Sequence, residues 1–420
     1  MKSKNLVGML TLVLVLVVNL LPLATVTGAD DPIAGEFLTG SLEHGGYNRT
    51  YEYYIPSGYA GSEAVPLLFL FHGLGSRGVE QIYLTNLTAL AEQEGFIAVF
   101  PDSTELEGVR WWNVGVTGYS QVLEDVDDVG FVAELIDWFD SGYNIDQTRI
   151  YATGMSNGAM FTYYVDINLP GTFAGIAAVT STMTLNLFYK EPASPVTVIV
   201  MMGTDDPLVP YDGGGWVGSV NATIDFWIEV NQTSTEPEVT VWEPTEEDPT
   251  RVIRYVYSGG RNGAEVILYK VEGGGHLWFG GPQYYPPAII GHNTYHIDAS
   301  EKIWEHLKDH ELMYDLTIDS TAGGSVTTPG EGIFIHNGGT EVSLVAEPDE
   351  SYRFVRWTGD MDTIVDVNAA STNITMDDEY SITANFKVQV NRALIGGIIA
   401  AVVAVGLLAF FLLRRKRRAA

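Results

Sequence analysis

The feature that most constrains the fold is an alternation, between residues 30 and 313, of short apolar runs and longer amphipathic segments. Continuous apolar runs of this length are typical of strands buried on both faces of a sheet. The clearest of these runs are 66–71, 96–100, 149–153, 173–179 and 196–202. The segments between them that predict helices are 79–94, 127–139 and 157–165. This alternation predicts a three-layer α/β domain over residues 30–313, with a mostly parallel sheet.

The end of this domain and the region after it follow a different pattern. Two further strands are expected at 251–257 and 264–271, before a closing helix near 298–310. Residues 314–388 then show strand-like runs separated by Gly, Asp and Asn turns, without helical periodicity. This composition predicts a small all-β module after the α/β domain.

Charge and cysteine content exclude several classes of function. The chain has 53 acidic and 22 basic residues, and residues 30–390 carry all the acidic residues with 14 Lys and Arg, a formal charge of −39. So acidic a surface repels phosphate backbones, which excludes nucleic acid as a partner. Cysteine is absent, so disulfides, zinc–thiolate sites and thiol nucleophiles are excluded as well.

The two ends of the chain predict export and a membrane anchor. Residues 1–29 have a positive start, an apolar stretch and a small-residue end at 27–29, the pattern of a secretory signal peptide. An uncleaved anchor is the alternative. Residues 394–413 form an uninterrupted apolar run that is long enough for a transmembrane helix. The basic cluster within 414–420 follows directly and predicts a cytoplasmic tail.

These ends place residues 30–390 on the extracellular face of the membrane. Five Asn-x-Ser/Thr sequons lie in this part, where glycosylation would be possible; they begin at Asn48, Asn86, Asn221, Asn231 and Asn373.

The strongest chemical signal is Gly154-Met155-Ser156-Asn157-Gly158, which lies between a predicted strand and a predicted helix. A strand-turn-helix with Gly on both sides of a Ser is what a nucleophile elbow requires, because the sharp turn leaves no room for side chains at the flanking positions. The pattern predicts Ser156 as the nucleophile of a hydrolase.

The base and its orienting carboxylate follow in the chain order of α/β-hydrolases, which is Ser, Asp or Glu, and then His. Asp205 and Asp206 follow the predicted strand 196–202, and His276 follows three glycines after the last predicted strand. Since the carboxyl ends of parallel strands carry the catalytic loops, Ser156, Asp206 and His276 are predicted to form a catalytic triad.

Two backbone N–H groups are expected to form an oxyanion hole. One is the N–H of Asn157, directly after the nucleophile. The other comes from the loop after strand 66–71, where Leu74 is favoured and Gly73 is the alternative. His72, in the same loop, is interpreted as structural because its neighbours already supply the required N–H groups.

With these residues in place, residues 35–310 resemble the secreted carboxylesterases that include feruloyl esterases and polyhydroxybutyrate depolymerases. The matching segments are FHGLGS, GFIAVFPD, DVDDVGFVAELIDWF, YNIDQTRIYATGMSNGAMFTY, MGTDDPLVPYDGG and GGGHLWFGG. The resemblance implies that the acid is Asp206 rather than Asp205. Segments in 314–388 resemble internalin-type B-repeat modules, which implies a spacer or adhesion role.

Three aromatic side chains in the loops, Trp112, Tyr211 and Trp278, are candidates for stacking on an acyl group or a sugar, with loop anchoring or core packing as the alternative. Asp125, Asp127 and Asp128 are interpreted as residues that cap the helix they begin rather than as metal ligands. No metal or organic cofactor is expected.

The sequence therefore predicts a membrane-tethered extracellular serine esterase. Its candidate substrates are feruloyl or acetyl esters of polysaccharides, or hydroxyalkanoate polyesters. A serine peptidase of the prolyl-oligopeptidase type and a non-catalytic surface adhesion protein remain as alternatives.

Overall fold

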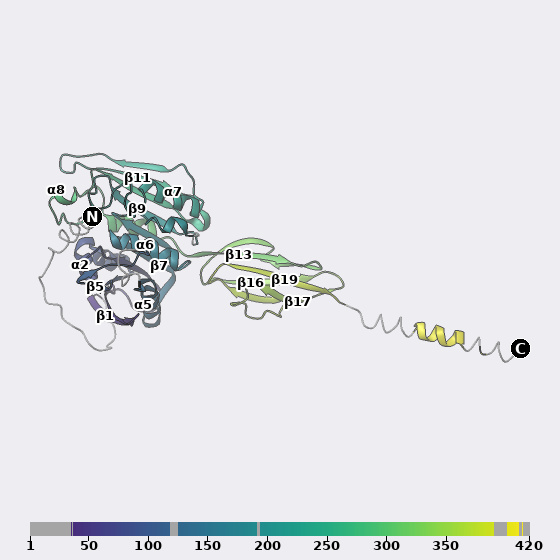
Figure 1. Ribbon diagram of the computed structural model, residues 1–420. Helices are drawn as coiled ribbons and strands as arrows, with labels where there is room; N and C mark the ends of the chain where they lie inside the picture. The colour runs from purple at the N-terminus through teal and green to yellow at the C-terminus, as the bar shows by residue number, and fades with distance from the viewer. Residues whose placement is uncertain are drawn as a thin grey trace. The chain divides into compact units, whose positions relative to one another are not determined.

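A computed structural model describes residue 35, residues 37–117, 125–190, 194–389 and 401–410, and Arg414. The chain divides into two compact units, Met1–Met313 and Tyr314–Ala420, and Figure 1 shows an α/β unit and an all-β module. The predicted signal segment 1–29 lies outside the described residues.

The first unit is built on one large mixed sheet. In the described residues it has ten strands, in the order β1-β2-β4-β3-β7-β8-β9-β12-β11-β10. Its six central strands are parallel to their neighbours; these are β4 (Ile97–Pro101), β3 (Val65–Phe71), β7 (Ile145–Met155), β8 (Gly175–Val179), β9 (Thr197–Gly203) and β12 (Val266–Glu272). Antiparallel strands extend the sheet at both edges; these are β1 (Phe37–His44), β2 (Tyr47–Tyr54), β11 (Arg251–Tyr257) and β10 (Glu238–Trp242).

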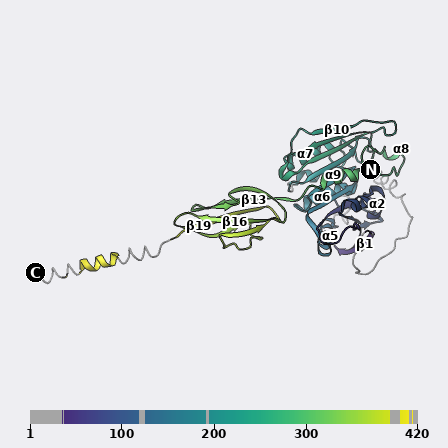
Figure 2. The ribbon, with the colours of Figure 1, turned by 180° about the vertical axis from the view of Figure 1, so that it is seen from behind.

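Helices cover both faces of the sheet. One hydrophobic cluster joins the sheet to α5 (Asp128–Gly142), α6 (Asn157–Asn168) and α7 (Val220–Asn231). A second cluster joins the opposite face to α3 (Leu87–Glu94) and α9 (Ala299–Leu307), with α2 (Gly78–Thr85) at its border. Figure 2 shows the ribbon from behind, where α9 is visible. The three-layer architecture predicted from the sequence is present.

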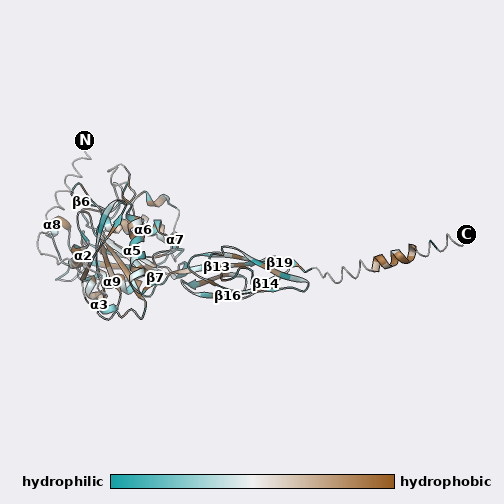
Figure 3. Ribbon diagram, turned by 90° about the horizontal axis from the view of Figure 1, so that it is seen from below, coloured by the Kyte–Doolittle hydropathy of each residue, from teal (hydrophilic) through white to brown (hydrophobic). Residues whose placement is uncertain are grey.

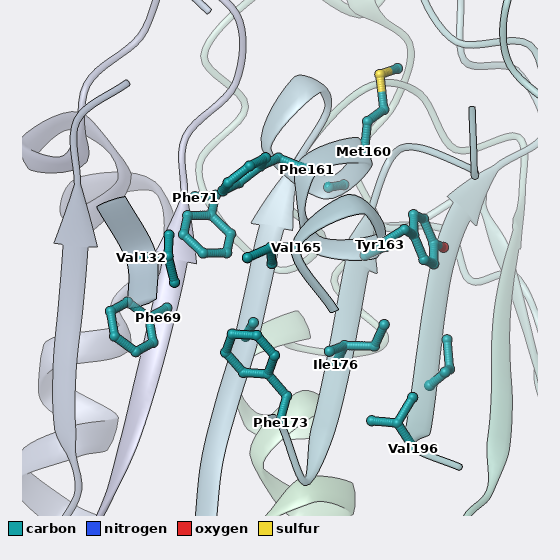
Figure 4. Packing of buried hydrophobic residues seen from close by; sticks show 14 of the residues in the cluster. Phe69, Phe71, Val132, Met160, Phe161, Tyr163, Val165, Phe173, Ile176 and Val196 are labelled. Carbon is teal, nitrogen blue, oxygen red and sulfur yellow. The ribbon is translucent and has the colours of Figure 1, made fainter. Parts of the chain in front are cut away.

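The central strands bury both faces. In β3, Leu67, Phe69 and Phe71 point into the first cluster, whereas Leu68 and Leu70 point into the second. This follows from the two-residue period of a strand. Figure 4 shows part of the first cluster, with side chains from β3, α5 and α6 packed together, and Figure 3 shows hydrophobic residues concentrated around the sheet of this unit.

The structure corrects the predicted elements in two ways. The single helix expected at 79–94 is two helices, because Asn86 adopts a left-handed conformation with φ 51° between α2 and α3. The edge strands β1, β2 and β10 and the helix α7 were not predicted. Strands β1 and β10 are partly exposed along their whole length and therefore lack a continuous apolar run. Strand β2 is largely buried, but Arg49, Thr50 and Glu52 interrupt its apolar residues.

The second unit is a β-sandwich-like module of two sheets, ordered β15-β13-β19-β17 and β14-β16-β18. Its strands are β13 (Met313–Ser320), β14 (Gly324–Thr328), β15 (Gly332–Asn337), β16 (Glu341–Pro348), β17 (Tyr352–Gly359), β18 (Ser371–Thr375) and β19 (Tyr380–Val388). Leu316, Leu344, Trp357 and Ile374 are fully buried between them. The module has its own core, as the composition of 314–388 predicts.

The predicted transmembrane segment 394–413 is described only at 401–410, which are helical. Within the described residues, no helix combines the length and hydropathy that a membrane span requires. Among the sequons, Asn231 is fully buried and bonds the backbone of Val196 with both ends of its amide. Because a glycan needs an exposed side chain, the folded protein excludes modification at this position.

A buried ion pair connects β2 to α5. Arg49 Nη2 lies 2.6 Å from Asp128 Oδ1, and the two side chains are 2% and 0% exposed. The second carboxylate oxygen of Asp128 accepts the backbone N–H of Asn113 at 2.7 Å. The guanidinium lies 4.0 Å from the centre of the Phe131 ring. Removing one partner of such a pair leaves a buried charge without compensation.

We therefore expect Asp128→Ala to lower the free energy of unfolding by about 3–5 kcal/mol. Urea denaturation of the variant and of wild type measures this difference. Arg149→Ala provides a control, because its 2.6 Å pair with Asp146 is partly exposed at 29% and 21%. Its loss is expected to cost about 1 kcal/mol or less. Equal losses for the two variants would contradict the role assigned to the buried pair.

Candidate active site

Ser156 lies at the junction of a strand and a helix. It follows the last residue of β7 and precedes the first residue of α6, with φ 57° and ψ −119°. Its N–H donates to Val179 O of the neighbouring strand at 3.0 Å, and its C=O accepts from Met160 N–H at 3.0 Å. A non-glycine residue in this strained conformation is a mark of functional turns, and here it places Ser156 at the carboxyl end of the central strand.

The two flanking glycines are required by close backbone contacts. A Cβ at Gly154 would lie 2.5 Å from the carbonyl carbon and oxygen of Gly158, and a Cβ at Gly158 would lie 2.1 Å from Phe71 O. Any larger residue would push α6 away from the ends of β7 and β3. The steric reason for the Gly-x-Ser-x-Gly pattern is therefore present at both positions.

Asp206 and His276 are hydrogen-bonded to each other. His276 Nδ1 lies 2.7 Å from Asp206 Oδ2, and the side chains are 5% and 0% exposed. The other oxygen, Asp206 Oδ1, accepts the backbone N–H groups of Leu208 at 2.8 Å and Val209 at 2.9 Å. The carboxylate is thus fixed by the turn that follows it. Asp205, by contrast, is exposed and accepts from Thr204 Oγ1 at 3.0 Å.

Hydrogen bonds between two loops bring this pair together. Asp205 N–H donates to Gly274 O at 2.9 Å, and Gly273 N–H donates to Thr204 Oγ1 at 2.9 Å. A Cβ at Gly203 would lie 2.2 Å from Gly274 O. Because Gly203 has no side chain, the loop after β12 can pack closely against the loop after β9.

The segments that carry the two predicted oxyanion donors both adjoin Ser156. Asn157 is the first residue of α6, where N–H groups have no partner within the helix and the helix dipole favours negative charge. The loop after β3 contacts the elbow, because a Cβ at Gly73 would lie 3.5 Å from Ser156 Cβ. In the described part of the chain, Leu74 N–H donates to no backbone carbonyl.

His72 is buried and has partners on both ring nitrogens. Nδ1 lies 2.7 Å from Gly73 O, and Nε2 lies 3.0 Å from Ser103 N. Because Ser103 N–H is a donor, Nε2 accepts and Nδ1 carries the proton. Burial lowers the pKa of His72 to about 4, so the ring is neutral at neutral pH. This arrangement agrees with a structural rather than a catalytic His72.

The structure corrects two of the three predicted substrate contacts. Trp112 is 0% exposed and stacks on Phe161, with ring centres 4.7 Å apart. Trp278 is 1% exposed, and its indole N–H donates to Ser300 Oγ at 3.1 Å. Both rings belong to the core, out of reach of a substrate. Tyr211 is partly buried against Lys270 and stays a prediction.

The acidic residues near the start of α5 have partners within the α/β unit. Asp127 Oδ1 accepts the N–H of Gly130 at 2.8 Å as the N-cap of the helix, as the sequence interpretation expects. Asp128 binds Arg49. Within the described residues, no group of three or more His, Asp or Glu side chains is arranged to hold a metal ion.

Comparison with known families agrees with this geometry. Residues 59–237 match the phospholipase/carboxylesterase family model, and residues 314–390 match the divergent InlB B-repeat domain. The first unit is a carboxylesterase domain of the serine α/β-hydrolase type. The resemblances identified in the sequence are therefore confirmed for both units.

Individual relatives are esterases. The putative esterase NocK of Nocardia uniformis subsp. tsuyamanensis is 27% identical over 59% of this chain and 75% of its own length. Feruloyl esterase B of Piromyces equi and the acetylxylan esterase/xylanase XynS20E of Neocallimastix patriciarum are both 26% identical, and the chain spans 41% and 31% of their lengths. The solved acetyl xylan esterase from Aspergillus awamori is 17% identical over 57% of this chain and 94% of that chain, with a TM-score of 0.42.

Substitutions at the two neighbouring aspartates distinguish their roles. We expect Asp206→Asn to lower kcat about 10³- to 10⁴-fold, because the amide cannot hold His276 with its proton on Nδ1. Asp205→Asn is the matched control and is expected to stay within about threefold of wild type, because its carboxylate is exposed and accepts from Thr204 Oγ1 rather than from His276. Hydrolysis of p-nitrophenyl acetate measures both, and a larger loss at Asp205 would show that the acid is wrongly assigned.

Proposed function

We propose that this protein is an exported serine esterase that removes acetyl or feruloyl groups from polysaccharides. The observation that carries the proposal is the 2.7 Å hydrogen bond between buried His276 and Asp206, on the same edge of the sheet as the strained elbow of Ser156. A His oriented by a carboxylate beside a serine at a strand–helix turn is the arrangement that activates a hydroxyl nucleophile.

Each of these groups has a defined role in the mechanism. Ser156 Oγ attacks the ester carbonyl while His276 Nε2 takes its proton. Asp206 holds the proton on His276 Nδ1 and stabilises the imidazolium that forms. The N–H groups of Asn157 and Leu74 donate to the tetrahedral oxyanion. His276 then returns the proton to the leaving alcohol, and water releases the acyl group by the same steps.

The choice of substrate rests on the named relatives, which are described as acetylxylan and feruloyl esterases. Acyl groups on plant polysaccharide are therefore favoured over hydroxyalkanoate polyesters. The strongly negative charge of residues 30–390 favours neutral over polyanionic polymers as partners. A serine peptidase and a non-catalytic adhesion protein are the alternatives that the assay must distinguish from an esterase.

Export and tethering are part of the same proposal. They are supported by the signal-like segment 1–29 and by the apolar run 394–413 with the basic cluster after it. The internalin-like module would then be a spacer between the esterase unit and the membrane.

The first test compares residues 30–390 with the Ser156→Ala variant on methyl ferulate, acetylated xylan, a 3-hydroxybutyrate oligomer and a peptide substrate. We expect hydrolysis of at least one polysaccharide-type ester and a loss in kcat of about a thousandfold or more in the variant. Preference for the peptide would favour the peptidase. An inert wild type, or a variant as active as wild type, would refute the serine esterase.

The second test concerns the anchor. When the full chain is expressed with its signal, we expect it in the membrane fraction, exposed to protease added outside the cell, since its apolar run has the length of a membrane span. A chain that ends at residue 390 is expected in the medium or the soluble fraction. Soluble full-length protein would contradict tethering without affecting the esterase assignment.

A further inference from the structure

The two oxyanion donors follow neighbouring strands, β3 and β7, but lie beyond the last paired residues, Phe71 and Gly154. Asn157 begins α6, whereas Leu74 belongs to a turn after β3. For both N–H groups to meet one oxygen, the turn and the helix end must be fixed to each other within a fraction of an ångström. The residue that connects them is Trp112, which lies in neither segment.

Trp112 is hydrogen-bonded to both sides. Its indole Nε1–H donates to His72 O at 3.1 Å, in the loop that carries Leu74. Its backbone N–H donates to Asn157 Oδ1 at 2.8 Å, and its backbone C=O accepts from Asn157 Nδ2 at 3.3 Å. One buried residue thus makes three hydrogen bonds across the two segments that supply the donors.

The ring of Trp112 is held by aromatic packing. It stacks on Phe161 of α6 at 4.7 Å with an interplanar angle of 12°, and it meets Phe71 of β3 edge-on at 5.2 Å. Phe71 and Phe161 also contact each other at 4.9 Å, and Figure 4 shows them side by side. The ring therefore packs against the strand that precedes the loop and the helix that follows the nucleophile.

The backbone next to Trp112 is also hydrogen-bonded, through Asn113, to α5. The next residue, Asn113, donates its N–H to buried Asp128 Oδ2 at 2.7 Å, and Asp128 is paired with Arg49. Arg49 Nη2 also donates to Asp102 O at 3.2 Å, next to Ser103, which binds the His72 ring. These contacts fix the Trp112 segment to α5 and to the end of β4.

Fixing His72 also fixes the direction of the Leu74 N–H. The Gly73 carbonyl accepts from His72 Nδ1–H at 2.7 Å and from Ser76 N–H at 3.1 Å. The peptide bond between Gly73 and Leu74 is trans, so its N–H points away from that carbonyl. Because His72 holds the Gly73 carbonyl, the Leu74 N–H faces the opposite side of this peptide bond.

We propose that Trp112 is a positioning residue that sets the distance between the two oxyanion donors. It touches no reacting atom, and it acts through His72 O on the Leu74 side and through the Asn157 side chain on the other. This inference rests on the proposed esterase mechanism.

The test is Trp112→Phe, which removes the indole N–H but keeps an aromatic ring and both backbone contacts to Asn157. The matched control is Trp227→Phe. Trp227 is also fully buried and stacks on Tyr163, but its Nε1 has no hydrogen-bond partner within the described residues. Both changes remove the same atoms from the core, so a general loss of packing should affect the two variants alike.

We expect Trp112→Phe to lower kcat on p-nitrophenyl acetate about 10- to 100-fold with KM changed less than about threefold, since only transition-state contacts are displaced. The affinity for a phenylboronic acid, which forms a tetrahedral adduct on the serine, should fall by the same factor as kcat/KM. Trp227→Phe should stay within about twofold in both measurements.

Equal kcat values for the two Trp variants, or a loss confined to KM, would overturn the positioning role while leaving the esterase intact. If Trp112→Phe does not fold, Asn157→Ala decides the matter, because it removes the two side-chain bonds to Trp112 and keeps the backbone N–H. Unchanged boronate affinity in that variant would also refute the proposal. An inert wild type would instead refute the esterase mechanism, and this inference with it.

Discussion

The catalytic arrangement depends on the contact between the start of α6 and the end of β3. Gly158 can lie against the Phe71 carbonyl only because it has no side chain, since a Cβ there would be 2.1 Å from the oxygen. This contact lets the helix begin directly over the central strand, with Ser156 at the turn. It also brings the loop after β3 to Ser156, so one steric condition positions both the serine and the loop that carries Leu74.

A second close contact positions Asp206 and His276. The loops after β9 and β12 meet at Gly203 and Gly274 and are joined by backbone hydrogen bonds. Asp206 and His276 are therefore presented by two loops that form one packed unit. Since β9 and β12 are neighbouring parallel strands, the sheet order places Asp206 and His276 together.

Much of this could be predicted from the sequence, because buried parallel strands leave continuous apolar runs and the elbow has a narrow steric requirement. The structural elements that were not predicted leave weaker patterns in the sequence. Strands β1 and β2 have no continuous apolar run, but they flank Gly45-Gly46, and such a Gly pair is a hairpin signal. Asn86 lies within an amphipathic pattern that does not reveal its left-handed turn. Trp112 and Trp278 were predicted as substrate contacts, but they belong to the core. A Trp that follows a strand can lie either in a binding loop or in the core, and only tertiary packing distinguishes the two.

The buried sequon at Asn231 has a consequence for producing the protein. Oligosaccharides are attached to asparagine during export, before a domain has closed its core, and the side chain is then still accessible. In the folded unit this amide bonds both the N–H and the C=O of Val196 at the start of β9. A glycan added early would therefore compete with the docking of α7 on the sheet, which makes a host without Asn-linked glycosylation the better choice for recombinant expression.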